Sequence, residues 1–393
     1  MMQENRQITL RDAALREILA RGAPILGTME DCDAEEVGNV SRGIGKLKMS
    51  DWMAAFPDHT EIVRMSLPGT HDTWNYTPEV QESLKRYTGP CQQRSIFRML
   101  NDGIRVFDLR YAWNPDLETI GFYHCENSPC YPFYYAFANK PCLNELVGCF
   151  HEAKAMLSPT TRMEDVFFGL YTWLDLHPTE TILLSMNYEP GTGTSDDARL
   201  QETLYHILTS ALAKRYWLQS RGSLGTLGEA RGKLILIQRF DFNLLPSHLT
   251  DRIGIHLNPG HWTVNGQDIK LEYAEGKIAY IQDYYRIEPS KNSNPASCIA
   301  DKLQVVKCHL EKAIDPELHP DQLFISFVSA SCRIEEPSLI PQVYALGDGE
   351  RMLGVNHGLF PWITEHRGKR FGVMFLDFYD GVSPLVEAII GQP

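Results

Sequence analysis

Polar and titratable side chains follow several separate apolar segments of this sequence. In SLPGTHDTW (66–74), an apolar run breaks at Pro68 and is followed at once by His71 and Asp72. Other apolar runs end in similar residues, which are Asp108 and Arg110 in FDLR, His124 in FYHCE, Asn187 in MNYE, Arg239 in QRFD, Asp283 and Tyr285 in IQDYY, and Asp377 in FLDFYD. Two histidines, an arginine and several carboxylates in one place would supply a general base, a general acid and an anion site.

Each of these residues alone has a simpler interpretation. A single histidine at the end of a strand is most often a hydrogen-bonded surface or core residue. Asp108 and Arg110 could form an ordinary ion pair, and Asp283 with Tyr285 could belong to a polar rim. The hypothesis of a site depends on how many such residues occupy corresponding places on different strands.

The segments that must position these residues alternate between two patterns. Apolar, β-branched or aromatic runs of strand length occur at 62–68, 104–111, 119–124, 181–187, 233–239, 279–284, 323–329 and 372–378. Helical patterns lie between several of them, at 161–176, with a capping box of Thr161 and Glu164, and at 196–215. Eight strands interleaved with helices predict an α/β fold, a single irregular TIM-type (β/α)8 barrel, with working residues at the carboxyl ends of its strands.

Composition and charge narrow the class of protein. The 393 residues are 43% hydrophobic and carry a formal net charge of −13. This charge argues against nucleic-acid binding and against electrostatic docking on an anionic membrane, but leaves transient apolar contact with a membrane open. No apolar run is long enough to span a membrane and the N-terminus lacks the pattern of a signal peptide, which favours a cytoplasmic protein. The nine cysteines are expected to be free thiols, and we expect a monomer.

The motifs resemble those of the X-domain family of phosphatidylinositol-specific phospholipases C, most closely its bacterial, metal-independent branch. The resemblance covers nearly everything after residue 50, through the segments SDWM (50–53), PGTHD (68–72), QQRSIFRMLNDGIRVFDLR (92–110), the His124 strand, HPTETILLSMNYE (177–189), ARGKLILIQRFD (230–241), YIQDYY (280–285) and VMFLDFYDGVSPL (373–385). It implies cleavage of an inositol phospholipid to diacylglycerol and a cyclic inositol phosphate, without a cofactor.

The resemblance also implies a role for each position. His71 would take the proton from the inositol 2-hydroxyl as that oxygen attacks phosphorus, and His124 would protonate the departing diacylglycerol oxygen. Arg110 would hold the phosphate oxygens, and Asp377 would orient His71. The remaining positions are Asp72 and Asp108, around Arg110 and His124, and Asn187, Arg239, Asp283 and Tyr285, where the family binds substrate.

Three positions bear on how far the resemblance extends. Cys125 replaces the glycine that usually follows the acid histidine, and Asn187 replaces a lysine, which would weaken a contact with substrate. Arg110 stands where calcium-dependent relatives have a second acidic ligand, so no metal is expected. Two alternatives stay open: the same mechanism on another phosphodiester, and a catalytically silent barrel that binds an inositol lipid or another phosphate ligand.

The domain boundaries follow from where the resemblance stops. Residues 1–49 are predicted to form an N-terminal amphipathic helix that stops at Gly22, followed by an irregular lead-in, and residues 50–393 to form the barrel. Residues 125–150, with the aromatic run CYPFYYAF (130–137), are interpreted as an insertion. Its aromatic side chains could grip lipid, but packing as a core or lid is favoured.

Overall fold

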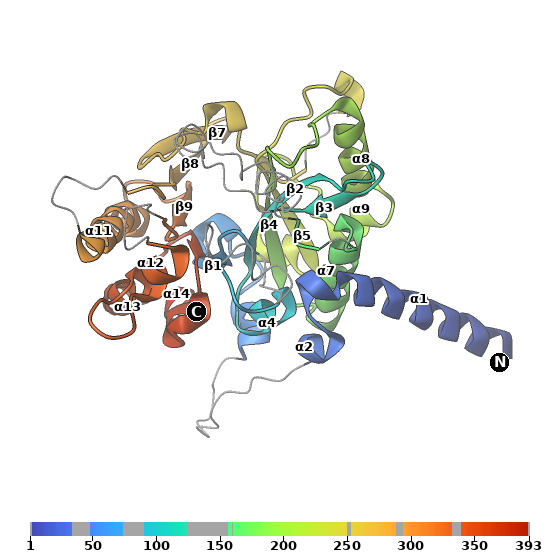
Figure 1. Cartoon of the computed structure of the whole chain (residues 1–393), viewed down its shortest axis with the longest axis horizontal. Coiled ribbons are helices and arrows are strands. Elements are labelled where there is room, and N and C mark those ends of the chain that lie inside the picture. Colours follow the sequence, from blue (N-terminus) through green and yellow to red (C-terminus); the bar gives the residue numbers. More distant parts are fainter. Residues whose placement is uncertain are drawn as a thin grey trace, which may run out of the picture.

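A single twisted sheet forms the centre of the computed structural model, which describes residues 2–33, 48–73, 90–123, 156–158, 160–249, 253–287, 294–331 and 339–391 (Figure 1). Its parallel strands are β1 (Leu67–Thr70), β2 (Val106–Trp113), β4 (Thr181–Tyr188), β5 (Lys233–Gln238), β6 (Ile255–His256), β8 (Lys277–Gln282), β9 (Leu323–Phe327) and β10 (Val373–Leu376). They lie in the order β6-β5-β4-β2-β1-β10-β9-β8, so the first and last parallel strands pair directly.

The sheet curves into a nearly closed barrel. The antiparallel strand β7 (Ile269–Ala274) extends the sheet beyond β8 and approaches β6 at the other end. The predicted irregular (β/α)8 barrel is confirmed by this arrangement of parallel strands. Because β1 lies between β2 and β10, the residues that follow β1 and β10 and those in the second half of β2 meet at one end of the barrel.

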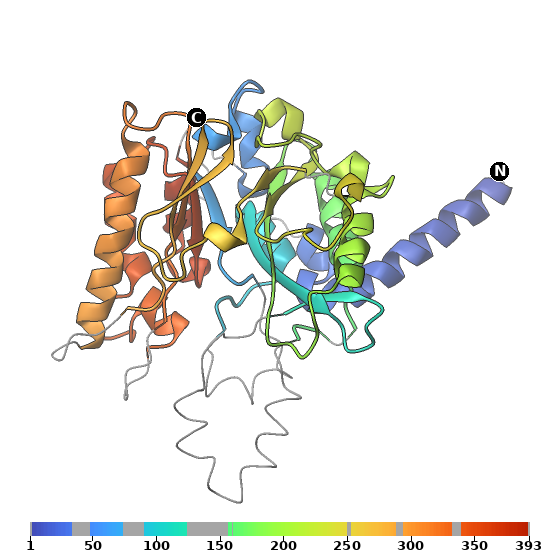
Figure 2. The same cartoon turned by 90° about the horizontal axis from the view of Figure 1, so that it is seen from above.

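Helices cover the outside of the sheet, with α7 and α8 on one side and α11 and α13 on the other (Figure 2). The α-helices are α1 (Met2–Leu26), α2 (Met29–Asp33), α4 (Ile96–Asn101), α7 (Met163–Leu176), α8 (Ala198–Thr209), α9 (Ala213–Tyr216), α10 (Leu227–Ala230), α11 (Pro295–Ile314), α12 (Pro341–Leu346), α13 (Val355–Glu365) and α14 (Pro384–Ile390). Short 3₁₀ helices span Met49–Ala55, Ile62–Arg64, Ser247–Leu249, Pro259–His261 and Tyr379–Gly381. No helix in the described ranges is long and apolar enough to cross a bilayer.

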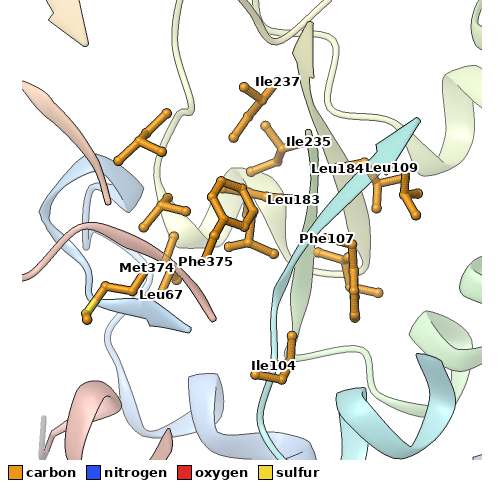
Figure 3. Close-up of a cluster of buried hydrophobic side chains, with 14 of the residues drawn as sticks. Leu67, Ile104, Phe107, Leu109, Leu183, Leu184, Ile235, Ile237, Met374 and Phe375 are labelled. Carbon is orange, nitrogen blue, oxygen red and sulfur yellow. The ribbon is translucent and has the colours of Figure 1, made fainter. Parts of the chain in front are cut away.

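Aliphatic and aromatic side chains from adjacent strands fill the interior of the barrel and the layer beneath the helices. Figure 3 shows this buried cluster, to which β1, β2, β4, β5 and β10 all contribute. Each fully buried leucine, isoleucine or phenylalanine contributes roughly 1.5–3 kcal/mol to folding. Gly69 allows β1 to approach β2, because a Cβ atom there would lie 2.9 Å from the Val106 Cβ. The core therefore holds the strand ends in fixed register.

The structure corrects the predicted strand set in one important place. The segment 119–124 was predicted as the third barrel strand, but β3 (Ile120–Phe122) runs antiparallel to β2 as the second arm of a hairpin. β2 therefore pairs directly with β4, and the eighth parallel strand is β6, which lies beside β5. It has two residues and is too short to produce a periodic pattern. The predicted strand at 62–68 likewise begins only at Leu67, after a 3₁₀ turn.

Helix boundaries also differ from the sequence prediction. The N-terminal helix α1 passes through Gly22, where a Cβ atom would lie 2.7 Å from the Leu26 Cδ1 and 3.3 Å from the Asp165 carbonyl oxygen of α7. Gly22 therefore permits close packing of two helices and does not end one. The α7 cap is formed by Asp165, whose carboxylate accepts from the Arg162 N–H at 3.1 Å, and not by Thr161 and Glu164.

The predicted helix at 196–215 is divided in two. Helix α8 begins after Asp197, whose carboxylate accepts from the Leu200 N–H at 2.7 Å, and the shorter α9 follows Ser210 and its turn. The predicted insertion at 125–150 and the lead-in around 34–47 lie outside the described residues, so the domain boundaries stay predictions. Of the cysteines, Cys32, Cys91, Cys298 and Cys308 lie in the described residues, and Cys91, Cys298 and Cys308 are free thiols.

Candidate active site

His71 lies directly after β1 and is held between two carboxylates. Its Nδ1 is 2.9 Å from the Asp377 Oδ1, and its Nε2 is 3.3 Å from the Asp72 Oδ2. The backbone around it is also fixed, because the His71 N–H donates to the Leu376 carbonyl at 3.0 Å and the Gln92 side chain donates to the His71 carbonyl at 3.0 Å. The imidazole therefore has a defined orientation, with Nδ1 directed at β10.

The two carboxylates change the protonation of His71. Burial alone would lower its pKa, but Asp72 and Asp377 stabilise the imidazolium and raise the pKa to about 9. The side chain is 16% exposed, so solvent still reaches the ring. His71 is consequently protonated at neutral pH in the free protein, and must lose that proton before it can act as a base.

Arg110 lies on β2 and forms ion pairs with two carboxylates. Its Nε is 2.8 Å from the Asp72 Oδ1, and its Nη1 is 3.2 Å from the Glu189 Oε2. Burial alone would lower the pKa of Arg110, but Asp72, Glu189 and Asp108 hold it well above the ordinary value. The side chain stays 22% exposed. A permanently charged, planar group in fixed orientation is suited to binding an anion with two oxygens.

Asp108 connects the carboxyl end of β1 to Arg239 after β5. Its Oδ2 accepts from the Asp72 N–H at 3.3 Å, and its Oδ1 accepts from the Arg239 Nη1 at 3.1 Å. The Asp72 backbone has a left-handed φ of 37°, a conformation that aspartate adopts more readily than most residues. Asp108 is almost fully buried, so its contribution is to position Asp72 and Arg239.

The carboxyl ends of the barrel strands surround an opening that we call the mouth. One arc of it is formed by Arg239, which follows β5, and by Asp283 and Tyr285, which follow β8. The Arg239 guanidinium stacks over the Trp262 ring at 4.1 Å, and the Trp262 indole donates to the Asp283 Oδ2 at 2.8 Å. The Tyr285 N–H donates to the Asn265 side chain at 2.9 Å, which fixes the chain after β8. Burial raises the pKa of Asp283. This arc offers charged, polar and aromatic groups side by side.

Asn187 belongs to β4 and is the register partner of Arg110 on the neighbouring strand β2. Paired residues of adjacent strands point to the same face of the sheet, so Asn187 lies next to Arg110. His124 is outside the described residues, and its role stays a prediction. The described chain before it ends at Tyr123, whose N–H donates to the Arg110 carbonyl at 2.9 Å. The β2–β3 hairpin thus returns to Arg110.

Several residues around the site were missed from the sequence. Glu189 could have been found, since it lies two residues after Asn187 and shares its side of β4. Trp262 is in a loop without a local pattern. A further ion pair joins His256, the last residue of β6, and Asp241, which follows β5, with 2.8 Å between Nε2 and Oδ1.

One group of described residues has potential metal ligands close together. Ligand atoms of His71, Asp72 and Cys91 all lie within 4.8 Å of one another. A thiol and an imidazole are poor partners for calcium or magnesium, which prefer oxygen. The second oxygen of Asp72 is already paired with Arg110. The set therefore does not fit a hard divalent cation, and the predicted metal-independence stays a prediction.

Comparison with known proteins shows similarity to a curated bacterial enzyme. A 1-phosphatidylinositol phosphodiesterase of Listeria monocytogenes is 26% identical over 186 residues, which is 47% of this chain and 47% of the relative. Over this segment the chain is similar to a bacterial phosphatidylinositol phosphodiesterase. It spans about half the length of the curated relative that it matches. No family model matches the sequence.

Solved structures show the same fold. A variant of the phosphatidylinositol-specific phospholipase C from Staphylococcus aureus superposes with a TM-score of 0.61 at 17% identity, covering 87% of this chain and 97% of that one. The enzyme from Listeria monocytogenes gives a TM-score of 0.58 at 20% identity, covering 87% and 98%. The resemblance stated from the motifs and the barrel fold are both confirmed.

Proposed function

We propose that this chain, which is similar to a bacterial phosphatidylinositol phosphodiesterase, is itself a phosphodiesterase that cleaves an inositol phospholipid. The observation that carries the proposal is the Arg110 guanidinium in β2, which is held in place between Asp72 and Glu189, next to the His71–Asp377 pair. An internal displacement at phosphorus needs a base and a fixed cation together, and both are present on neighbouring strands.

The proposed reaction assigns one step to each group. Neutral His71 takes the proton of the inositol 2-hydroxyl while the 2-oxygen forms a bond to phosphorus. The bond between phosphorus and the diacylglycerol oxygen breaks, and His124 gives that oxygen a proton. Arg110 holds two phosphate oxygens and offsets the negative charge that grows on them. The products are diacylglycerol and a cyclic inositol phosphate.

The remaining residues would bind the inositol ring. Arg239 and Asp283 offer a donor and an acceptor for ring hydroxyls, and Tyr285 offers an aromatic face beside them. Val264 is 76% exposed in the same loop as Trp262, a suitable position for transient apolar contact with the surface that holds the lipid. Membrane binding is described for the enzyme from Staphylococcus aureus.

Asn187 favours a second candidate, the same mechanism on another phosphodiester. The resemblance predicts a lysine at this position, and an amide beside Arg110 removes one positive charge from the mouth. A smaller total positive charge would weaken binding of a strongly anionic headgroup and tolerate a different one.

Phosphorus NMR of the purified protein with phosphatidylinositol micelles tests the proposal. We expect the lipid resonance to be replaced by that of a cyclic inositol phosphate. A lipid resonance that broadens on binding but does not convert would indicate a silent binding barrel. Conversion of glycerophosphoinositol but not of the lipid would indicate the second candidate.

A further inference from the structure

Lys302 is a charged residue in a fully buried place. It lies on α11, its side chain is not exposed to solvent, and its Nζ donates to the Tyr284 carbonyl at 2.6 Å. Tyr284 stands between Asp283 and Tyr285, two of the three residues of this arc that are predicted to contact the inositol ring. Lys302 therefore holds the backbone of residues 283–285 from the side of α11. We call residues 283–285 the binding wall.

The charges that face Lys302 belong to the same site. Burial lowers its pKa to about 7, and Asp283 and Asp377 limit that fall by stabilising the ammonium group. These carboxylates come from the ends of two different strands, β8 and β10. His309, the other buried titratable group on this face of α11, has its pKa lowered to about 4 by burial and is neutral at pH 7.

Such a residue is expensive for the fold. A buried ammonium group loses its hydration, and an apolar side chain of similar length would fill the space at lower cost. The apolar stripe of α11 contains Cys298, Ile299, Val306 and Leu310, so an apolar residue at 302 would continue it. A structural role alone does not explain a lysine there.

We propose that Lys302 is a positioning residue for inositol recognition. Its ammonium group holds the Tyr284 carbonyl and faces Asp283 from the protein side, so that Asp283 stays ionised and correctly directed for the ring hydroxyls. Lys302 does not touch the substrate and acts through Asp283 and Tyr284. This inference rests on the proposed function, because it concerns the residues that would bind the inositol ring.

Free myo-inositol is the appropriate probe, because its binding depends on the wall and not on cleavage. We would measure its dissociation constant by titration calorimetry at about pH 6, where the ammonium form of Lys302 predominates, for the wild type, Lys302→Met, Asp283→Asn and the double variant. Lys302→Met should weaken binding about tenfold or more, as expected for loss of interactions with a charged group. The double variant should lose less affinity than the sum of the two single losses, because Lys302 acts in part through Asp283. Equal affinity of Lys302→Met and the wild type, or additive losses, would overturn the inference.

Two further variants separate positioning from loss of structure. Lys302→Gln keeps a polar donor without the charge, and it serves if the methionine variant does not fold; unchanged inositol affinity in a folded Lys302→Gln would also overturn the inference. His309→Gln is the matched control on the same buried helix face, where His309 Nδ1 lies 2.8 Å from the Ser326 Oγ. It should leave inositol affinity within about twofold of the wild type. An equal loss in both would show that disturbing α11 is sufficient.

The outcomes also distinguish this inference from the proposed function. Kinetics on phosphatidylinositol should show a raised KM for Lys302→Met and a kcat changed by less than about threefold, since remote binding interactions act mainly on binding. Wild-type protein that binds inositol without cleaving the lipid would end the proposed function and leave the Lys302 comparison valid. Wild-type protein that cleaves the lipid, with inositol affinity unaffected by Lys302→Met, would do the reverse. Absence of both activities would overturn both.

Discussion

Two arginines, one just before β2 and one within it, have different roles in the two halves of the barrel. Arg105, just before the strand, is fully buried, pairs with Glu180 at 2.6 Å and donates to four backbone carbonyls. Arg110, within the strand, is 22% exposed and faces the carboxylates of Asp72, Glu189 and Asp108. The Arg105 guanidinium is fully enclosed by protein groups. The Arg110 guanidinium is held by carboxylates and is still partly exposed to solvent.

Their pKa values follow this difference. Burial lowers the pKa of Arg105, because Glu180 and, more weakly, Asp51 only partly offset the loss of water. Three carboxylates outweigh burial at Arg110 and raise its pKa. At the amino end of the strands, which is closed by buried side chains, Arg105 therefore stabilises the fold. At the open end, where the mouth lies, Arg110 maintains a positive charge on a partly exposed side chain. The predictions below test this contrast, from the largest expected effect to the smallest.

Replacement of His71 should give the largest loss. His71→Ala removes the proposed base, so kcat should fall by about 10²–10⁴-fold, the usual contribution of general acid–base catalysis. His124→Ala should do the same if it is the acid. Turnover of micellar lipid measures both, and circular dichroism checks the fold. Wild-type-like turnover of either variant would remove that residue from the mechanism.

Replacement of Arg105 should affect stability and not chemistry. Arg105→Met leaves Glu180 buried without its partner, which should cost about 3–5 kcal/mol of unfolding free energy. Urea denaturation measures this loss, and the variant that stays folded should keep a kcat close to that of the wild type. A large fall in kcat without a loss of stability would contradict the division between the two ends.

Arg110→Lys should show the opposite behaviour. Lysine keeps the charge but not the two-pronged geometry, so turnover should fall about 10²-fold, as for loss of a fixed donor to a developing charge. The urea midpoint should change little, because the side chain is at the open end. Activity within about twofold of the wild type would show that a point charge is sufficient.

The pH dependence should reveal the protonation of His71. Its pKa of about 9 lies above the ordinary 6.5, so the basic form grows about tenfold per pH unit from pH 7 towards 9, and kcat/KM should rise with it. The stabilisation from this raised pKa is complete below about pH 6.5 and is lost as pH rises through about 9, so stability should fall over the same range. Asp377→Asn should move the rising limb to lower pH. A limb unmoved by Asp377→Asn would exclude this pairing as its cause.

Removal of metal ions should have the smallest effect. Since Arg110 already supplies positive charge beside Asp72, excess EDTA should leave turnover unchanged, and calcium should not increase it. An enzyme assay with and without chelator decides this. Loss of turnover with EDTA and recovery with calcium would place the protein with metal-dependent relatives.

The sequence predicted most of this arrangement because strand ends carry strong local patterns. Asp108 and Arg110 share a side of β2 through their two-residue spacing, and Asp377 follows an unmistakable apolar strand. Residues 119–124 had the composition of a barrel strand, and only the pairing revealed an antiparallel hairpin. Composition specifies a strand but not its direction.

Other parts of the site depend on long-range contacts. Trp262 reaches Asp283 from a loop, which no periodic pattern predicts. Lys302 was accessible in principle, because it interrupts the apolar stripe of α11 and a charge on a buried face requires a partner. That partner, the Tyr284 carbonyl, is 18 residues away and appears only in three dimensions.

The pairing of β1 with β10 also has a consequence for the folding of the protein and for its inactivation by heat. His71 and Asp377 are separated by 306 residues, so their contact forms only when the last strand of the barrel docks against the first. Closing so long a loop is slow and comes late in folding. Newly synthesised chains should therefore become competent only in the final step of assembly. On heating, local separation of β1 from β10 should abolish activity while most of the helices are still intact.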